Sequence, residues 1–146
     1  MNKLIIYIDG GARGNPGPSA LGVLFLGEKG EILKEYSQCL GKKTNNEAEY
    51  LSLIFALKKI KALFGKEKLQ NLPIEINSDS ELLVKQMNGQ YKIKEPSLQK
   101  LFLEAWNLKI GFKNLKFCLI PREENKRADK LVNIALDAET NVQKLF

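Results

Sequence analysis

The 146-residue sequence predicts a single α/β domain in which helices flank a mixed β-sheet. Three observations indicate this class. The first forty residues contain three strand-like runs, later residues alternate between helical and strand-like periods, and the length suits one hydrophobic core. Strands separated by helices run parallel, whereas strands joined by tight turns run antiparallel, so we expect both kinds of pairing.

The N-terminal third predicts three strands. Lys3–Ile8 is a continuous apolar run, which is typical of a strand buried on both faces. Residues 9–19 are rich in glycine and proline and predict a loop. Two further strand-like runs, Ala20–Leu26 and Glu31–Leu40, are separated by a Gly-Glu-Lys-Gly turn that predicts a hairpin.

From Asn46 the apolar residues follow a helical period, after a polar connection in which an asparagine is expected to cap the helix. This helix is expected over Asn46–Leu63. The later elements are expected to be a strand at Pro73–Asn77, helices at Ser80–Met87 and Ser97–Leu108, a strand at Leu115–Ile120 and a helix at Lys126–Ala138. We assign residues 1–138 to the domain and 139–146 to a short C-terminal tail.

The composition restricts the chemistry. There is no histidine, which excludes Ser-His-Asp and Cys-His catalysis and histidine-ligated zinc. The net charge of +6 favours a polyanionic partner, either nucleic acid or an anionic membrane surface. Cys39 and Cys118 form no C-x-x-C pair and suggest core residues in a reducing compartment. Because we find no signal peptide and no apolar stretch of membrane-spanning length, we expect a cytoplasmic protein that does not associate with membranes.

Four acidic residues are placed where they could form one site. Asp9 and Asp79 each follow an apolar strand, so parallel neighbouring strands would carry both carboxylates at one edge of the sheet. Glu49 and Asp129 lie on the inward sides of their predicted helices. Clustered carboxylates repel one another unless cations bind between them, and hard oxygen ligands suit Mg²⁺ or Mn²⁺.

Each acid also has a purely structural explanation. Asp9 could begin a turn, Asp79 could cap a helix, and Glu49 could interact with a helix dipole. Asp129 could be an edge charge of an amphipathic helix. Their joint placement favours a metal site, because three of only four aspartates fall at the predicted edge or on faces turned toward it.

Four segments, covering nearly the whole chain from Lys3 to Ala138, resemble the type 1 ribonuclease H family. In order they are Y-I-D-G-G-A-R-G-N-P-G-P around Asp9, T-N-N-E-A-E-Y around Glu49, N-S-D-S around Asp79 and P-R-E-E-N-K-R-A-D around Asp129. The resemblance implies the ribonuclease H fold, a five-stranded mixed sheet, with these four acids as metal-binding catalytic carboxylates. It also implies hydrolysis of the RNA strand of RNA/DNA hybrids with two Mg²⁺ or Mn²⁺ ions, leaving 3′-hydroxyl and 5′-phosphate ends.

The resemblance further implies a set of substrate contacts. The positions that match family contacts to the hybrid are Asn15, Asn45, Asn46 and Ser80, with Gly11 allowing close backbone approach. Thr44 matches the family residue that binds a phosphate of the DNA strand. Turn geometry and helix capping explain the same glycine and asparagine residues equally well.

The sequence departs from many members of that family in two places. The loop before the last helix lacks the histidine found there in many relatives, and Arg122 or Glu123 could replace it, as in a histidine-free branch of the family. The basic helical handle of several bacterial members is also absent. Near its place, Lys85, Lys92 and Lys94 form either a reduced basic patch or ordinary solvated charge. Without the handle, we expect weaker hybrid binding than in handle-bearing members. We also expect the protein to be a monomer.

Two alternatives are weighed against a metal-dependent endoribonuclease. A catalytically silent nucleic-acid-binding module of the same fold would have no reason to keep four repelling carboxylates. A different nuclease of the same superfamily, such as a resolvase or an exonuclease, is disfavoured by the T-N-N-E-A-E and D-G-G-A-R-G-N-P-G-P segments.

Overall fold

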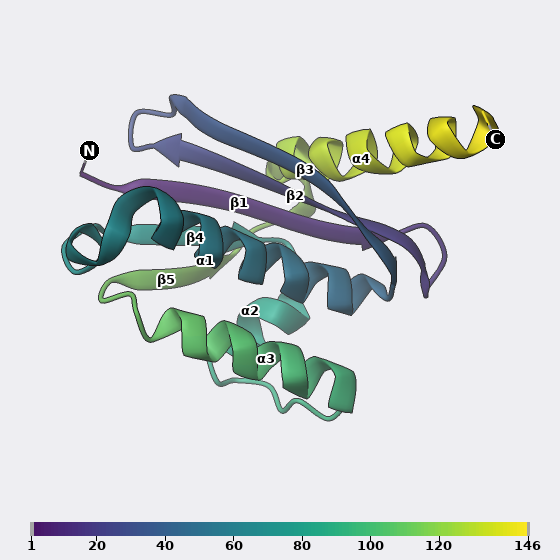
Figure 1. Cartoon of the computed structure of the whole chain (residues 1–146). Coiled ribbons are helices and arrows are strands. Elements are labelled where there is room, and N and C mark those ends of the chain that lie inside the picture. The colour runs from purple at the N-terminus through teal and green to yellow at the C-terminus, as the bar shows by residue number, and fades with distance from the viewer. Residues whose placement is uncertain (1, 146) are drawn as a thin grey trace.

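The computed structural model describes residues 2–145, which form a five-stranded sheet with helices on both faces (Figure 1). The strands are β1 (Leu4–Ala12), β2 (Gly17–Gly27), β3 (Ile32–Lys43), β4 (Ile74–Ser78) and β5 (Leu115–Leu119). The helices are α1 (Asn45–Leu69), α2 (Glu81–Met87), α3 (Pro96–Lys109) and α4 (Lys126–Leu145), and a 3₁₀ turn at Arg122–Glu124 precedes α4. No helix in this part of the chain is long and apolar enough to span a membrane.

The sheet contains both kinds of pairing, in the order β3-β2-β1-β4-β5. The hairpin strands β1, β2 and β3 pair antiparallel, whereas β1–β4 and β4–β5 pair parallel. Figure 1 shows α4 on one face of the sheet and α1, α2 and α3 on the other. The predicted α/β class, with a five-stranded mixed sheet flanked by helices, is therefore confirmed.

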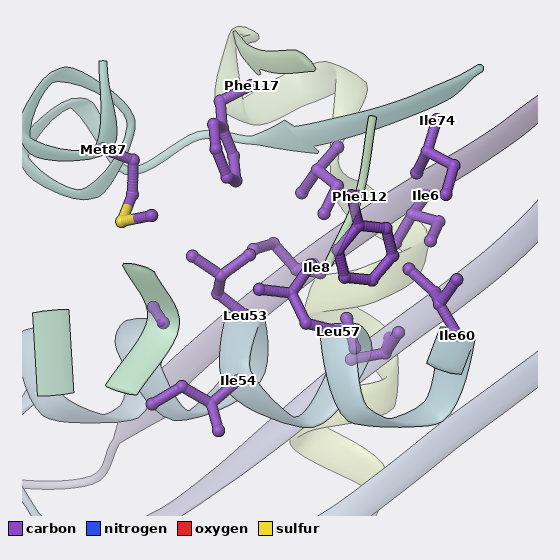
Figure 2. Close-up of a cluster of buried hydrophobic side chains, with 14 of the residues drawn as sticks. Ile6, Ile8, Leu53, Ile54, Leu57, Ile60, Ile74, Met87, Phe112 and Phe117 are labelled. Carbon is purple, nitrogen blue, oxygen red and sulfur yellow. The ribbon is translucent and has the colours of Figure 1, made fainter. Parts of the chain in front are cut away.

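The main core lies between β1 and α1. Ile6 and Ile8, which alternate along β1, are almost completely buried. They pack beside Leu53, Leu57 and Ile60 of α1, as Figure 2 shows. Fully burying one side chain of this size stabilises the fold by about 1.5–3 kcal/mol, so this layer fixes α1 firmly against the centre of the sheet.

The opposite face has a much smaller core. Ala20 of β2 packs against Val132, Ala135 and Leu136 of α4. These α4 residues belong to the apolar side that the sequence pattern predicts for the closing helix. Because this layer is thin, polar contacts contribute more to the orientation of α4 than to that of α1.

The first two strands are longer than predicted. Asp9 lies within β1, paired with Gly22, and does not follow the strand directly as expected. The antiparallel ladder continues to Ala12, so the expected loop over residues 9–19 shrinks to residues 13–16. Glycine occurs within these strands at Gly10 and Gly22 because helices approach the backbone closely there.

The helices α1 and α4 also exceed their predicted bounds. α1 reaches Leu69, with a break at Gly65, whose φ of 76° lies in the left-handed region. α4 continues to Leu145, so residues 139–145, which we expected to form a tail, are helical, whereas Phe146 lies outside the described residues. The polar composition after Ala138 hid this extension.

The interpretation of Cys39 as a core residue is wrong. Its side chain is exposed on β3, at the edge of the sheet, where Sγ lies 3.2 Å from the Ala135 carbonyl oxygen of α4. Cys118 is half-buried. An apolar run on an edge strand loses the cover that a central strand has.

Candidate active site

Strand register brings Asp9 and Asp79 together. The parallel pairing of β1 with β4 ends at Tyr7 and Asn77, and each aspartate lies two residues further along its chain. Asp9 still lies within β1 and Asp79 directly follows β4, so both carboxylates lie at the same edge of the sheet. One oxygen from each of Asp9, Glu49 and Asp79 lies within 4.8 Å of the others. We call these three carboxylates the acidic cluster.

Glu49 reaches the cluster because a glycine lets α1 approach β1. A Cβ atom added to Gly10 would lie 2.2 Å from the Ala48 carbonyl oxygen, which no side chain tolerates. In the close contact that results, the Gly10 N–H donates a 2.6 Å hydrogen bond to Glu49 Oε1. The carboxylate is therefore oriented by the backbone of the strand that carries Asp9.

The first turn of α1 is fixed by Thr44, not by an asparagine as expected. The Glu47 N–H donates to Thr44 Oγ1 at 3.1 Å, and the Thr44 N–H donates to Glu47 Oε1 at 2.9 Å. This reciprocal capping box satisfies two backbone donors at the helix start. It holds the turn that carries Glu49.

Asp129 lies at the opening of the site, outside the acidic cluster. It is exposed in the first turn of α4. A second close approach brings that helix near, because a Cβ on Gly22, the residue paired with Asp9, would lie 2.2 Å from the Ala128 carbonyl oxygen. Asp129 lines the same hollow as the cluster, and its negative charge acts on Asp9.

Sequence reasoning missed Asn125. This side chain is buried, and its Nδ2 donates to the Ile8 carbonyl oxygen at 2.8 Å and to Asp79 Oδ2 at 3.2 Å. Asn125 therefore joins the end of β1, the Asp79 carboxylate and the start of α4. The only signal in the sequence was its place at the end of the P-R-E-E-N segment.

Burial and mutual repulsion make the acidic cluster electrostatically costly. Burial, then the charges of Asp79 and Asp129, raise the pKa of Asp9 to about 8. Burial, followed by the charges of Asp9 and Asp79, raises the pKa of Glu49 well above its usual value. Among residues 2–143, whose side chains the structure describes, no lysine or arginine forms an ion pair with any member of the cluster. A hard divalent cation is the partner that these oxygen donors fit.

The acids open into a hollow of about 490 Å³. The expected site residues that line it are Asp9, Gly11, Asn45, Asn46, Glu49, Asp79, Ser80, Arg122 and Asp129. Those that do not are Asn15, Thr44, Glu123, Lys85, Lys92 and Lys94. The structure therefore brings together the acids, the first turn of α1 and one of the two candidates for the missing histidine.

Two of the expected substrate-binding asparagines support each other. Asn45 Oδ1 accepts from the Ala12 N–H at 2.9 Å, and Asn15 Oδ1 accepts from the Asn45 N–H at 3.0 Å. Ser80 caps α2 by accepting from the Leu83 N–H at 3.2 Å. Each residue thus has a structural role, and the amide NH₂ and hydroxyl hydrogen remain as possible donors to a ligand.

The three lysines expected to form a basic patch do not act alike. Lys85 Nζ lies 3.0 Å from Glu81 Oε1 and 5.1 Å from the centre of the Tyr91 ring, so its charge is largely matched within the protein. Lys92 and Lys94 line a separate hollow of about 460 Å³ beside α2 and α3. They belong to residues 88–95, which connect α2 to α3 and which we call the basic segment.

Fold and site together define a ribonuclease H-like protein. A family description, "Reverse transcriptase-like", matches residues 7–135. The structure of LC11-RNase H1, isolated from compost, is 51% identical, with 96% of this chain and 99% of that chain covered and a TM-score of 0.91. RNase H1 from Halobacterium salinarum is 39% identical, with 93% and 98% covered and a TM-score of 0.84. The chain belongs to the type 1 ribonuclease H family.

Some curated relatives are much longer. The bifunctional protein Rv2228c of Mycobacterium tuberculosis is 39% identical over 137 residues, which cover 93% of this chain but 36% of the relative. The chain thus spans about a third of the length of such relatives. A structure of the N-terminal RNase H domain of that protein is 37% identical, covers 91% of this chain and has a TM-score of 0.82.

Proposed function

We propose that this protein is a metal-dependent endoribonuclease that hydrolyses the RNA strand of RNA/DNA hybrids, leaving 3′-hydroxyl and 5′-phosphate ends. The observation that carries the proposal is the acidic cluster, with carboxylate oxygens within 4.8 Å of one another and no cationic partner in the described chain. Two further findings support it: the family membership, and the fact that the 50% identical LC11-RNase H1 was crystallised with an RNA/DNA hybrid.

We assign the metal ligands to Asp9, Glu49, Asp79 and Asp129. When bound, two Mg²⁺ or Mn²⁺ ions would supply an activated water and stabilise the leaving 3′-oxygen. Asp9 would be the central ligand of this set, because its carboxyl lies with those of Glu49 and Asp79 and the charge of Asp129 also acts on it. The Gly10 N–H and the Asn125 amide keep Glu49 and Asp79 oriented before any ion arrives.

We assign substrate positioning to the polar rim of the hollow. Asn45, Asn46 and Ser80 carry short amide and hydroxyl groups suited to ribose 2′-hydroxyls, which distinguish RNA from DNA. Arg122 lines the hollow and Glu123 does not, so Arg122 is our candidate for holding a phosphate in place of the family histidine.

Binding of the DNA strand is assigned to residues outside the hollow. Thr44 accepts a hydrogen bond as the α1 cap, yet its hydroxyl can still donate one to a phosphate. Asn15 accepts from the Asn45 N–H beside Thr44, and Lys92 and Lys94 add positive charge further along. Gly11 lines the hollow itself, where it allows the backbone to approach the hybrid closely. The assignment of function to residues 1–138, and action as a cytoplasmic monomer, stay predictions.

The test is cleavage of an RNA/DNA hybrid labelled on its RNA strand, with and without Mg²⁺ or Mn²⁺. We expect metal-dependent cuts within the RNA, and Asp9→Asn should slow them by about a thousandfold, since a metal site supplies several kcal/mol of transition-state stabilisation. Glu104→Gln is the matched control, because Glu104 is an exposed carboxylate paired with Lys58 far from the site.

Product ends and alternative substrates sharpen the assignment. The new RNA 5′ ends should accept label from a polynucleotide kinase only after phosphatase treatment. Cleavage assays with duplex RNA, duplex DNA and a DNA duplex that contains one ribonucleotide establish which substrates the protein accepts. No metal-dependent cleavage by the parent, or undiminished cleavage by Asp9→Asn, would refute the proposal. Hybrid binding without cleavage would favour the silent binding module.

A further inference from the structure

The loop between β1 and β2 is fastened to α4 by one arginine. Arg13 Nη2 donates to Asp137 Oδ1 at 2.6 Å and to Asn133 Oδ1 at 3.3 Å. Asn133 and Asp137 are one helical turn apart, so a single guanidinium spans two successive turns of α4. Asp129 lies one turn before Asn133 on the same face of the helix.

Asn133 connects this contact to Asp129. Its Nδ2 donates to the Asp129 carbonyl oxygen at 3.1 Å and to the carboxylate oxygen Oδ2 at 3.4 Å. An amide whose oxygen accepts from Arg13 must present its NH₂ on the opposite side, which is toward Asp129. Arg13, Asn133 and Asp129 all line the same hollow.

Asp129 needs such support more than the other acids do. Glu49 accepts from a strand N–H, and Asp79 accepts from a buried asparagine. Asp129 is exposed, and the Asn133 amide donates to its carboxylate oxygen at 3.4 Å. Its other side-chain contact in the site is with the Asp9 carboxyl, another acid, so Asn133 supplies the amide donor that orients this carboxylate.

We propose that Arg13 is a positioning residue, which orients the Asn133 amide so that its NH₂ holds the Asp129 carboxylate toward the metal site. This inference rests on the proposed function, because it treats Asp129 as a ligand. A direct role for Arg13 in binding a substrate phosphate is the competing explanation. The 2.6 Å ion pair with Asp137 favours the positioning role, since it already matches the charge of Arg13.

The chain offers a matched control. Arg127 is a second exposed arginine that pairs with a carboxylate at 2.6 Å, that of Glu35, and its partner has no contact with the acids. Arg13→Ala and Arg127→Ala therefore remove the same charge and the same kind of ion pair. Asn133→Ala is the second variant, because it removes the amide bridge while leaving the Arg13–Asp137 pair intact.

The experiment measures Mn²⁺ binding by isothermal titration calorimetry without nucleic acid, and then single-turnover hybrid cleavage against Mn²⁺ concentration. We expect Arg13→Ala and Asn133→Ala to weaken Mn²⁺ binding by about 10-fold, as removal of outer-shell partners does, and Arg127→Ala to leave it unchanged. Cleavage by the two variants should fall at low Mn²⁺ and recover at saturating Mn²⁺. Thermal melts establish that all three variants fold.

Asp137→Asn separates the two roles of Arg13. If Arg13 positions Asp129, Asp137→Asn should weaken Mn²⁺ binding less than Arg13→Ala does, because Arg13 keeps its hydrogen bond to Asn133, and hybrid binding should not tighten. If Arg13 binds phosphate, Asp137→Asn should tighten hybrid binding, whereas Arg13→Ala should weaken it with Mn²⁺ affinity unchanged. That result, or equal Mn²⁺ affinity in Arg13→Ala, Asn133→Ala and Arg127→Ala, would overturn the inference. Failure of the proposed function would appear instead in the parent and in Asp9→Asn.

Discussion

The acidic cluster and the basic segment serve the same proposed substrate but are built differently. Asp9 and Glu49 are each only 8% exposed, and backbone groups and close helix contacts orient them. Lys92 and Lys94 are exposed, and hydrogen bonds to the backbone hold the segment, among them those from the Gln86 amide to the Lys92 carbonyl oxygen at 3.1 Å and from the Gln99 amide to the Ile93 carbonyl oxygen at 2.8 Å. Changes in the cluster should therefore alter folding and chemistry, whereas changes in the segment should alter charge attraction that salt can screen.

The largest effect is expected at Gly10, where the cluster depends on close backbone contact. Gly10→Ala should lower the free energy of unfolding by about 3–4 kcal/mol, because the new Cβ would overlap the Ala48 carbonyl oxygen. Urea unfolding measures the change. Gly11→Ala is the neighbouring control, since its Cβ would make an ordinary 3.6 Å contact with Val132. Equal stability of the two variants would show that α1 can shift away without cost.

A second prediction concerns Asn125, which joins β1 to Asp79. Asn125→Ala should cost about 2–3 kcal/mol, because the buried Ile8 carbonyl would lose this amide donor and a cavity would form. Asn88→Ala is the matched change on the other region, where an exposed amide donates to Phe117 over 3.4 Å, and it should cost under about 0.5 kcal/mol. Similar losses of stability in both variants would contradict the contrast between the regions.

These two residues also show where sequence reasoning stops. Apolar runs and helical periods predicted the sheet, and strand ends predicted that Asp9 and Asp79 would meet. The role of Gly10 could not be predicted, because it depends on how closely α1 packs, and local pattern carries no such distance. Asn125 contacts a carbonyl 117 residues away in the sequence. Local signals find the acids, whereas long-range packing determines what holds them.

A third prediction uses the raised pKa of Asp9. Its value in the folded protein, about 8, exceeds the ordinary 3.8, so the metal-free fold binds a proton more tightly than the unfolded chain does. The contribution of Asp9 to the free energy of unfolding is therefore fully present below about pH 4 and is lost as the pH rises toward 8. With a metal chelator at pH 8.5, Asp9→Asn should be more stable than the parent by several kcal/mol, and near pH 4 the two should agree.

Urea unfolding across this pH range measures the difference, with Glu104→Gln as the control for losing a carboxylate. Added Mn²⁺ should reverse the order, since it stabilises the parent by binding and has little affinity for the variant. The prediction would be contradicted if Asp9→Asn were less stable than the metal-free parent at every pH. Repulsion among the carboxylates would then not destabilise the metal-free fold.

The smallest effect is expected in the basic segment. The double variant Lys92→Ala and Lys94→Ala should leave stability and Mn²⁺ affinity unchanged and weaken hybrid binding only several-fold at low salt, because each lysine contributes at most about one phosphate contact. The slope of log affinity against log salt should become shallower by about 1–2. Lys85→Ala should change the slope less, since Glu81 already matches its charge. If all three lysines contributed equally to the salt dependence, the Lys85–Glu81 pair would have to open when the hybrid binds. The basic segment would then rearrange on binding, in contrast to the acidic cluster, which is oriented in advance.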